Sequence, residues 1–313
     1  MTTHPPHTTS VDAEGVGVAM LGVSDFDGTQ ARTFERTPDG IGVNEAYRLA
    51  IGTVMGERAL ATYMRNGEHR SRTASEIVAS LAGVTSPELF EVAARKVSEG
   101  ESMDGIHHDL VRIHGHHYDG LFSPTKEQVR ALTDVVIEAK LEPLRKQIGR
   151  AMPEGQGFWP RPTVGFIPFS RAVSEQKIAR NIQTGVITAG YREFIFNVYN
   201  LYEIERPDLF ISDVEIQDMF PELSPEERAK PNTLPMDIIQ ERWTHSLGTE
   251  APDQTMLGDR IGYIGDDEVR DGGLAANSGV HFFNESDPDS NQTWQDFARF
   301  LGIEIEPENW REQ

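Results

Sequence analysis

Two carboxylates one residue apart, Asp25 and Asp27, follow directly on the apolar run Val16–Val23. A valine-rich run bounded by turn residues predicts a strand buried on both faces, and open α/β sheets place their ligands beyond the carboxyl ends of such strands. There one carboxylate can attack phosphorus as a nucleophile, giving an aspartyl-phosphate, while the other transfers protons. Gly28 permits the sharp turn that follows, and the Thr29 hydroxyl can hold it. The simpler interpretation is an ordinary strand exit with an Asp-Gly turn.

A second group of carboxylates follows another apolar segment, Arg260–Gly265. It contains Asp266, Asp267 and Asp271. Carboxylates clustered at the end of a strand repel one another unless water surrounds them or a cation binds them. Hard oxygen ligands of this kind suit Mg²⁺, so the segment predicts a magnesium site.

Between these two segments lie a hydroxyl and a lysine that could bind an anion. The short apolar run Thr184–Gly190 carries Thr188 near its end, just before a predicted helix, where free N–H groups and the helix dipole favour negative charge. Lys230 precedes Pro231, which predicts an extended loop around the lysine. The alternatives are a helix N-cap at Thr188 and a solvated surface lysine at position 230.

Composition indicates a globular protein with a substantial core. The 313 residues are 25% charged and 38% hydrophobic, and no apolar run approaches the roughly 20 residues that span a membrane. The absence of cysteine excludes disulfides, thiolate metal sites and cysteine nucleophiles, and cytoplasmic localisation is the default expectation. Residues 1–14 are polar, lack the pattern of a signal peptide, and are predicted to form a disordered tail.

The net charge of −21 argues against nucleic acid and anionic membrane surfaces as partners. An anionic substrate would need positive charge close to its binding site. A bound divalent cation together with a few lysine or arginine side chains could supply it.

The middle of the chain is predicted to be a helical insertion, because residues 30–159 show helical periodicity and no convincing strand. The predicted helices there are Val43–Met64, Glu76–Leu81, Pro87–Glu99 and Pro124–Gly149. After the insertion the pattern alternates between strands and helices. Further strands are predicted at Leu209–Asp213 and Val280–Phe283, and a loop at 214–231. The predicted helices are Ser170–Arg180, Tyr191–Leu201, Leu234–Trp243, Gly272–Gly279 and Trp294–Leu301.

The segment His107–His117 holds five histidines, which invites a metal-binding hypothesis because imidazole is a common ligand of transition metals. The spacing matches no established metal motif. A polar turn between helices of the insertion is the preferred interpretation.

Four features in fixed order together resemble the haloacid dehalogenase (HAD) superfamily of phosphohydrolases. Asp25-Phe26-Asp27-Gly28-Thr29 looks like its first motif, and Thr188 at the end of Val186-Ile187-Thr188 looks like the second. Lys230-Pro231 looks like the third motif, and Gly265-Asp266 through Asp271 looks like the fourth. The match covers roughly residues 15 to 30 and 160 to 285.

The resemblance implies an α/β fold, a Rossmann-like core with a central parallel sheet flanked by helices and a mainly helical cap inserted after the first strand. The core would comprise residues 15–30 and 160–313, and the cap residues 31–159. The cap would close over the site and choose among substrates.

The resemblance also implies roles for the site residues. Asp25 would be the nucleophile and Asp27 the general acid/base, while Thr188 and Lys230 would hold the phosphoryl oxygens. Mg²⁺ would be bound by Asp25, the backbone carbonyl of Asp27, and Asp266; whether Asp271 or Asp267 completes the metal site stays open.

The function expected from these features is Mg²⁺-dependent hydrolysis of a small phosphomonoester. A phosphomutase would use the same site but protect the aspartyl-phosphate from water. A non-catalytic binding protein on the same frame is the alternative from a different class. A dehalogenase is disfavoured because it needs neither Asp27 nor a metal, and a nucleic-acid end phosphatase is opposed by the net charge. The natural substrate and the oligomeric state are not indicated.

Overall fold

The structure, a computed structural model, describes residues 18–65, 73–113, 122–248 and 256–311. The expected tail at residues 1–14 lies outside them. The chain divides into two compact units, one made of residues 1–32 and 161–313 and the other of residues 33–160. Among the described helices, none is both long enough and apolar enough to cross a membrane.

The first unit is built on a five-stranded sheet whose strands all run parallel, in the order β3-β2-β1-β4-β5. The chain goes from the central strand β1 to β2 and β3 on one side, then returns to β4 and β5 on the other. The strand order therefore reverses beside β1, which is where open α/β sheets form ligand-binding crevices. This architecture confirms the predicted fold class. The strands are β1 (Met20–Ser24), β2 (Ile182–Thr188), β3 (Leu209–Ser212), β4 (Ile261–Gly265) and β5 (His281–Asn284).

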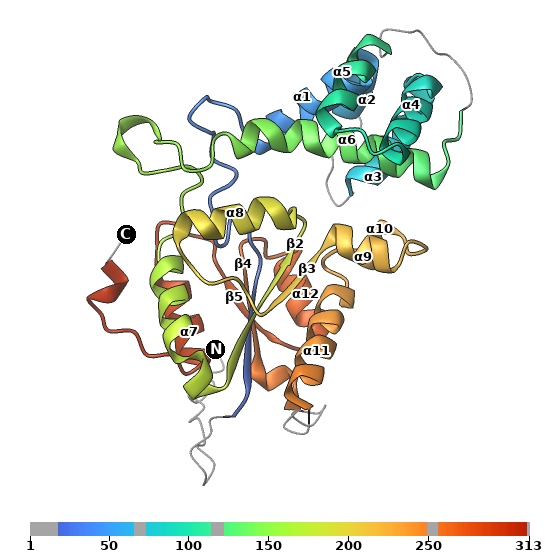
Figure 1. The fold of residues 1–313 in the computed structure, drawn as a ribbon. Coiled ribbons are helices and arrows are strands. Elements are labelled where there is room, and N and C mark those ends of the chain that lie inside the picture. The colour runs from blue at the N-terminus through green and yellow to red at the C-terminus, as the bar shows by residue number, and fades with distance from the viewer. Residues whose placement is uncertain (1–17, 66–72, 114–121, 249–255, 312–313) are drawn as a thin grey trace. The chain divides into compact units, whose positions relative to one another are not determined.

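Helices cover both faces of the sheet, as Figure 1 shows. One face carries α7 (Phe166–Arg180) and α13 (Gln292–Phe300), and the other carries α11 (Leu234–Leu247) and α12 (Asp271–Ser278). The unit's other α-helices are α8 (Arg192–Tyr202), α9 (Asp213–Met219) and α10 (Pro225–Arg228).

Glycines in neighbouring strands allow α13 to approach the sheet closely. Gly22 of β1 and Gly262 of β4 are partners in the parallel register. A Cβ atom at Gly262 would lie 2.8 Å from the ring of Phe297 and 2.9 Å from the ring of Phe300. The buried Phe297 ring therefore occupies space that a side chain at these strand positions would need.

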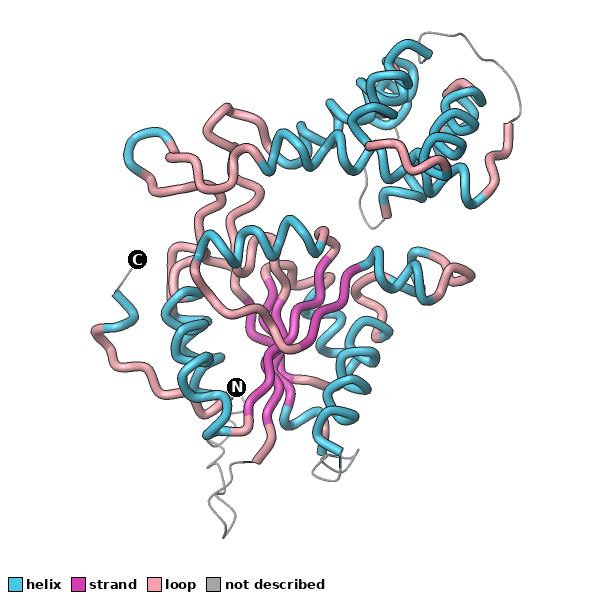
Figure 2. The backbone as a smooth tube through the Cα atoms, viewed as in Figure 1, coloured by secondary structure: helices cyan, strands magenta, loops and turns pink. Residues whose placement is uncertain are grey.

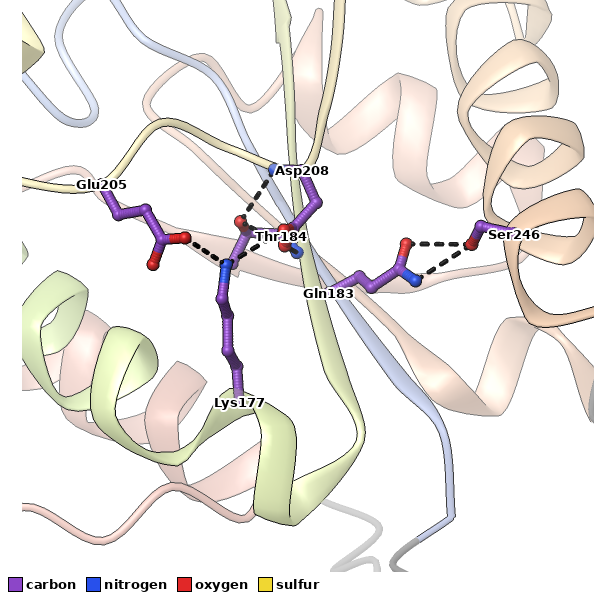
Figure 3. A network of polar contacts seen from close by, with 6 residues as sticks. All are labelled: Lys177, Gln183, Thr184, Glu205, Asp208 and Ser246. Atoms are coloured by element: carbon purple, nitrogen blue, oxygen red, sulfur yellow. Dashed lines mark hydrogen bonds and ion pairs between the residues drawn. The ribbon is translucent and has the colours of Figure 1, made fainter.

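A polar network at the amino end of β2 fixes the loop that leads into β3 (Figure 3). Lys177 of α7 pairs with Glu205 at 2.7 Å and with Asp208 at 3.0 Å. Asp208 also accepts a hydrogen bond from the Thr184 backbone N–H at 2.9 Å. On the other side of β2, Gln183 bonds to Ser246 of α11. Because Thr188 ends the same strand, this network lies at the edge of the sheet opposite to the predicted site.

The second unit consists mainly of helices, drawn in cyan in Figure 2. Its apolar residues form one buried cluster that includes Ile51, Phe90 and Leu132, each fully buried. The α-helices are α1 (Val43–Met55), α2 (Glu57–Arg65), α3 (Ala74–Ser80), α4 (Pro87–Ser98), α5 (Met103–Ile113) and α6 (Lys126–Arg145).

The structure corrects three sequence predictions in this architecture. The predicted helix Val43–Met64 is two helices, because the chain breaks at Gly56 with φ of 92°. The segment 214–231, predicted as a loop, contains most of α9 and all of α10. Helix α9 begins with a capping box in which Ser212 and Glu215 exchange hydrogen bonds. Such short helices carry too little periodicity to be recognised in the sequence.

The third correction concerns the histidine segment. Its first part belongs to α5 and is not a turn, because Ile106 and Leu110, one helical turn apart, are fully buried. His107 and His108 are therefore helical residues, whereas residues 114–117 lie outside the described part of the chain.

We expect Gly262→Ala to destabilise the sheet unit by about 1–3 kcal/mol, because the added methyl group overlaps two phenylalanine rings. Gly185→Ala in β2 is the matched control, since its Cβ would meet neighbours only at 3.5 Å or more. Urea unfolding followed by tryptophan fluorescence would compare them. Equal stability of the two variants would contradict the close packing of α13 on the sheet.

Candidate active site

Asp25 is the first residue after β1, and its backbone continues the pairing with β4. The Asp25 N–H donates to the Ile264 carbonyl at 2.9 Å. The chain then turns at Gly28, whose φ is +83°, a region that favours glycine. A Cβ at this position would lie 2.2 Å from Asp266 Oδ2. Glycine is therefore required both for the turn and for the close approach of the Asp266 carboxylate.

Three carboxylates from two strand ends lie together at this edge of the sheet. Oxygen atoms of Asp25, Asp266 and Asp271 are all within 4.8 Å of one another. Thr29 places its hydroxyl 3.4 Å from Asp266 Oδ1. The two acidic segments that the sequence analysis singled out thus meet at one point, because β1 and β4 are adjacent parallel strands.

Lys230 brings a positive charge into this group. Its Nζ lies 3.0 Å from Asp25 Oδ1 and 2.8 Å from Asp271 Oδ1, and its side chain is only 4% exposed. The lysine is thus buried between the two carboxylates and is not the solvated surface lysine of the alternative interpretation. It follows α10 in a turn before α11, outside any helix.

Asp271 and Asp267 have different surroundings. Asp271 accepts hydrogen bonds from the Tyr263 hydroxyl at 2.8 Å and from the Asp267 N–H at 3.2 Å. The exposed Asp267 instead accepts from the N–H groups of Val269 and Arg270 at the start of α12. Of these two aspartates, Asp271 is therefore the one that lies with Asp25 and Asp266.

Asp27 and Thr188 lie on the β2 side of the site. Both approach Gly190, where a Cβ atom would be 3.2 Å from Thr188 Oγ1 and 3.3 Å from Asp27 Oδ2. The buried Thr188 hydroxyl accepts a hydrogen bond from the Gly190 N–H at 2.9 Å. The N-cap of α8 is Tyr191, so Thr188 does not have the capping role that was its alternative.

The site contains more carboxylates than lysines, and the repulsion between the carboxylates shifts their pKa values. Burial, followed by repulsion from Asp271, Asp27 and Asp266, raises the pKa of Asp25 to about 8 even though Lys230 opposes the shift. Burial and the charge of Asp271 raise the pKa of Asp266 to about 6. The pKa of Asp271 is lowered, since the attraction and hydrogen bond of Lys230, with the Tyr263 hydroxyl, outweigh burial.

This donor set fits a magnesium ion. Its oxygen atoms are hard ligands, and their mutual spacing of up to 4.8 Å is comparable with the roughly 4 Å between opposite ligands of one Mg²⁺. A divalent cation would also remove the repulsion that raises the pKa values of Asp25 and Asp266. The side chains that could hold it are those of Asp25, Asp266 and Asp271.

Two residues near this site, Tyr263 and Glu285, were not expected from the sequence. Tyr263 is fully buried in β4 and binds Asp271, and a tyrosine in a buried strand signals that its hydroxyl needs a partner. Glu285 is 1% exposed directly after β5. Its signal is the same as that of Asp25 and Asp266: a carboxylate where an apolar strand ends.

No protein-family profile and no curated protein sequence matches the chain. Solved structures do. A HAD hydrolase from Bacillus subtilis, in a form bound to magnesium, is 11% identical with a TM-score of 0.38, covering 91% of this chain and 99% of its own. A protein named as a phosphoglycolate phosphatase from Lactobacillus delbrueckii is 16% identical with a TM-score of 0.36 and 92% coverage of both chains.

A third solved structure, named as a beta-phosphoglucomutase from Thermotoga maritima, is 12% identical with a TM-score of 0.35, covering 89% of this chain and 91% of its own. The names of these three structures are thus those of a HAD hydrolase, a phosphatase and a phosphomutase. At these TM-scores the likeness supports nothing further, and the fold class of this chain follows from its own sheet.

In the absence of metal, we expect the unfolding free energy of the wild type to fall as pH rises from about 4 to about 8. Over this range folded Asp25, with a pKa of about 8, keeps a proton that the unfolded chain releases near its ordinary pKa of 3.8. The lowered pKa of Asp271 changes the unfolding free energy only at pH values below this range.

Asp25→Asn removes this titration, so the stability of the metal-free variant relative to the wild type should rise by up to about 4 kcal/mol between pH 5 and pH 8. Urea unfolding in EDTA at pH 5 and pH 8 would measure the difference. Parallel pH profiles for the two proteins would contradict a raised pKa of Asp25 in the folded protein.

Gly28→Ala should destabilise the protein more than Gly40→Ala. Both glycines have similar positive φ values, +83° and +79°, so the backbone strain of about 1 kcal/mol is common to both. Only at Gly28 does the new methyl group collide with Asp266, whereas Gly40 has open space. Thermal unfolding would report the difference, and equal losses would contradict the close approach of Asp266 to the turn.

Proposed function

We propose that the protein is a Mg²⁺-dependent phosphatase that hydrolyses small phosphomonoesters through an aspartyl-phosphate on Asp25. The observation that carries the proposal is the meeting of Asp25, Asp266 and Asp271 within 4.8 Å, with Lys230 Nζ 3.0 Å from Asp25. Phosphoryl transfer depends mostly on positioning and charge neutralisation, and this arrangement offers a nucleophile, a cation site and a fixed positive charge.

Asp25, Asp266 and Asp271, with the backbone carbonyl of Asp27, would hold the magnesium ion. The ion would supply charge neutralisation for the phosphoryl oxygens. Lys230 would hold a phosphoryl oxygen and favour the ionised form of Asp25, which it already contacts. Thr188, whose hydroxyl lies close to Gly190, would bind another of these oxygens.

In the first step an Asp25 oxygen attacks phosphorus, and the bond from phosphorus to the leaving ester oxygen breaks. Asp27 donates its proton to that oxygen, so the product leaves as an alcohol. Asp27 is suited to this role because it lies beside Asp25 but outside the group of three carboxylates.

In the second step a water molecule attacks the same phosphorus, and the bond to the Asp25 oxygen breaks. Asp27, now ionised, takes the proton of the water, so that Asp25 and inorganic phosphate are released and both aspartates return to their starting states.

We propose a small phosphorylated metabolite as the substrate. The net charge of −21 opposes binding of a nucleic acid, whose many phosphates would be repelled. A single phosphate group, in contrast, can be neutralised locally by one cation and one lysine.

Asp25→Asn should lower kcat for an aryl phosphate by more than about 10³-fold, since no carboxylate remains to attack. EDTA should abolish wild-type activity and added Mg²⁺ should restore it. Asp267→Asn is the matched control, because this neighbouring aspartate is exposed and binds only the start of α12. Full activity of Asp25→Asn, or activity that survives chelation, would refute the proposed mechanism.

A further inference from the structure

Glu285, the residue directly after β5, is a buried carboxyl group without a hydrogen-bond partner. The residue is 1% exposed, and neither of its side-chain oxygens forms a hydrogen bond within the described residues. A buried acceptor left unsatisfied costs about 1–3 kcal/mol, and more when it is charged. Such a group needs an explanation, and a donor that binds there would supply one.

The register of the sheet places Glu285 beside the candidate cation site. Gly265 of β4 pairs with Asn284 of β5, and the Glu285 N–H donates to the Gly265 carbonyl at 2.8 Å. Asp266 follows Gly265, so Asp266 and Glu285 are the first residues after two adjacent parallel strands. Their backbones therefore start from neighbouring positions at the edge of the sheet that carries the site.

The electrostatic environment agrees with this placement. Burial, with smaller contributions from the negative charges of Asp287 and Asp266, raises the pKa of Glu285 to about 8. The nearby Thr293 hydroxyl, which donates its hydrogen bond to the Asn284 carbonyl, and Arg32 oppose this shift. Arg32 itself contacts the loop that follows Glu285, through the Pro288 carbonyl and the Asp289 carboxylate at 2.7 Å. Glu285 is thus within electrostatic reach of Asp266.

We propose that Glu285 is a further residue of the cation site and accepts a hydrogen bond from a water molecule of the hydration shell of Mg²⁺. The inference rests on the proposed function, since it requires the ion. Glu285 lies outside the group of carboxylates within 4.8 Å of one another, so it does not join them as a direct ligand. Mg²⁺ usually keeps several water ligands, and their hydrogen-bond acceptors tune affinity for the metal.

Calorimetric titration with MgCl₂ tests this role. Glu285→Gln should weaken Mg²⁺ binding about 10-fold, because a bound cation favours the ionised carboxylate, which accepts the water's hydrogen bond more strongly than an amide does. Glu268→Gln removes the same charge from an exposed residue two positions after Asp266 and should change the dissociation constant less than about 2-fold, because solvent screens it.

A second variant, Glu285→Met, separates a role in metal binding from a role in the fold. It should weaken Mg²⁺ binding at least as much as Glu285→Gln, yet its metal-free form should melt a few degrees above the wild type, because an unsatisfied polar group is replaced by an apolar one. Wild-type affinity for Mg²⁺ in both variants, with a lowered melting temperature, would show that Glu285 serves only the fold.

The outcomes distinguish this inference from the proposed function. A wild type that binds no Mg²⁺ overturns both. A wild type that binds Mg²⁺ but hydrolyses no phosphomonoester refutes the proposed function and leaves the role of Glu285 in cation binding supported if its variants bind Mg²⁺ more weakly.

Discussion

Repulsion among carboxylates at the ends of β1 and β4 is the constraint on which the rest of the site depends. Asp25, Asp266 and Asp271 are within 4.8 Å of one another, and one lysine lies among them. Coulomb energies at such distances are large where water is scarce. Lys230 stabilises the ionised form of Asp271, while the pKa values of Asp25 and Asp266 remain raised. The fold therefore holds these groups in an arrangement that a cation would relieve.

Helix α12 keeps the charged groups in place. It begins at Asp271, and its buried Leu274 and Ala275 pack into the core of the sheet unit. Its Asn277 donates to the Pro231 carbonyl at 2.9 Å, next to Lys230. A single helix thus positions both an acid and the loop that carries the lysine. The burial of apolar side chains of α12 stabilises the fold and so offsets the repulsion between the carboxylates.

Much of this site can be predicted from the sequence because the carboxyl ends of parallel strands meet at one edge of the sheet. Asp25, Thr188 and Asp266 each follow a recognisable apolar run, so their proximity follows once the strands are known to be parallel. The interactions of Tyr263 and Glu285 depend instead on which strands are neighbours and how far side chains reach across them. Local periodicity contains no such information, and for the same reason it could not reveal α9, whose single buried residue is Ile216.

The two segments that connect the helical unit to the sheet unit, far apart in the sequence, lie side by side where they join the sheet unit. The Arg32 N–H donates to the Arg161 carbonyl at 2.8 Å, and Ala31 forms a bridge with Pro162. Since the two connecting segments are already joined by backbone hydrogen bonds, everything between them can be exchanged without opening the sheet. Evolution could therefore exchange the inserted module as a whole while the arrangement of carboxylates at the strand ends is inherited unchanged.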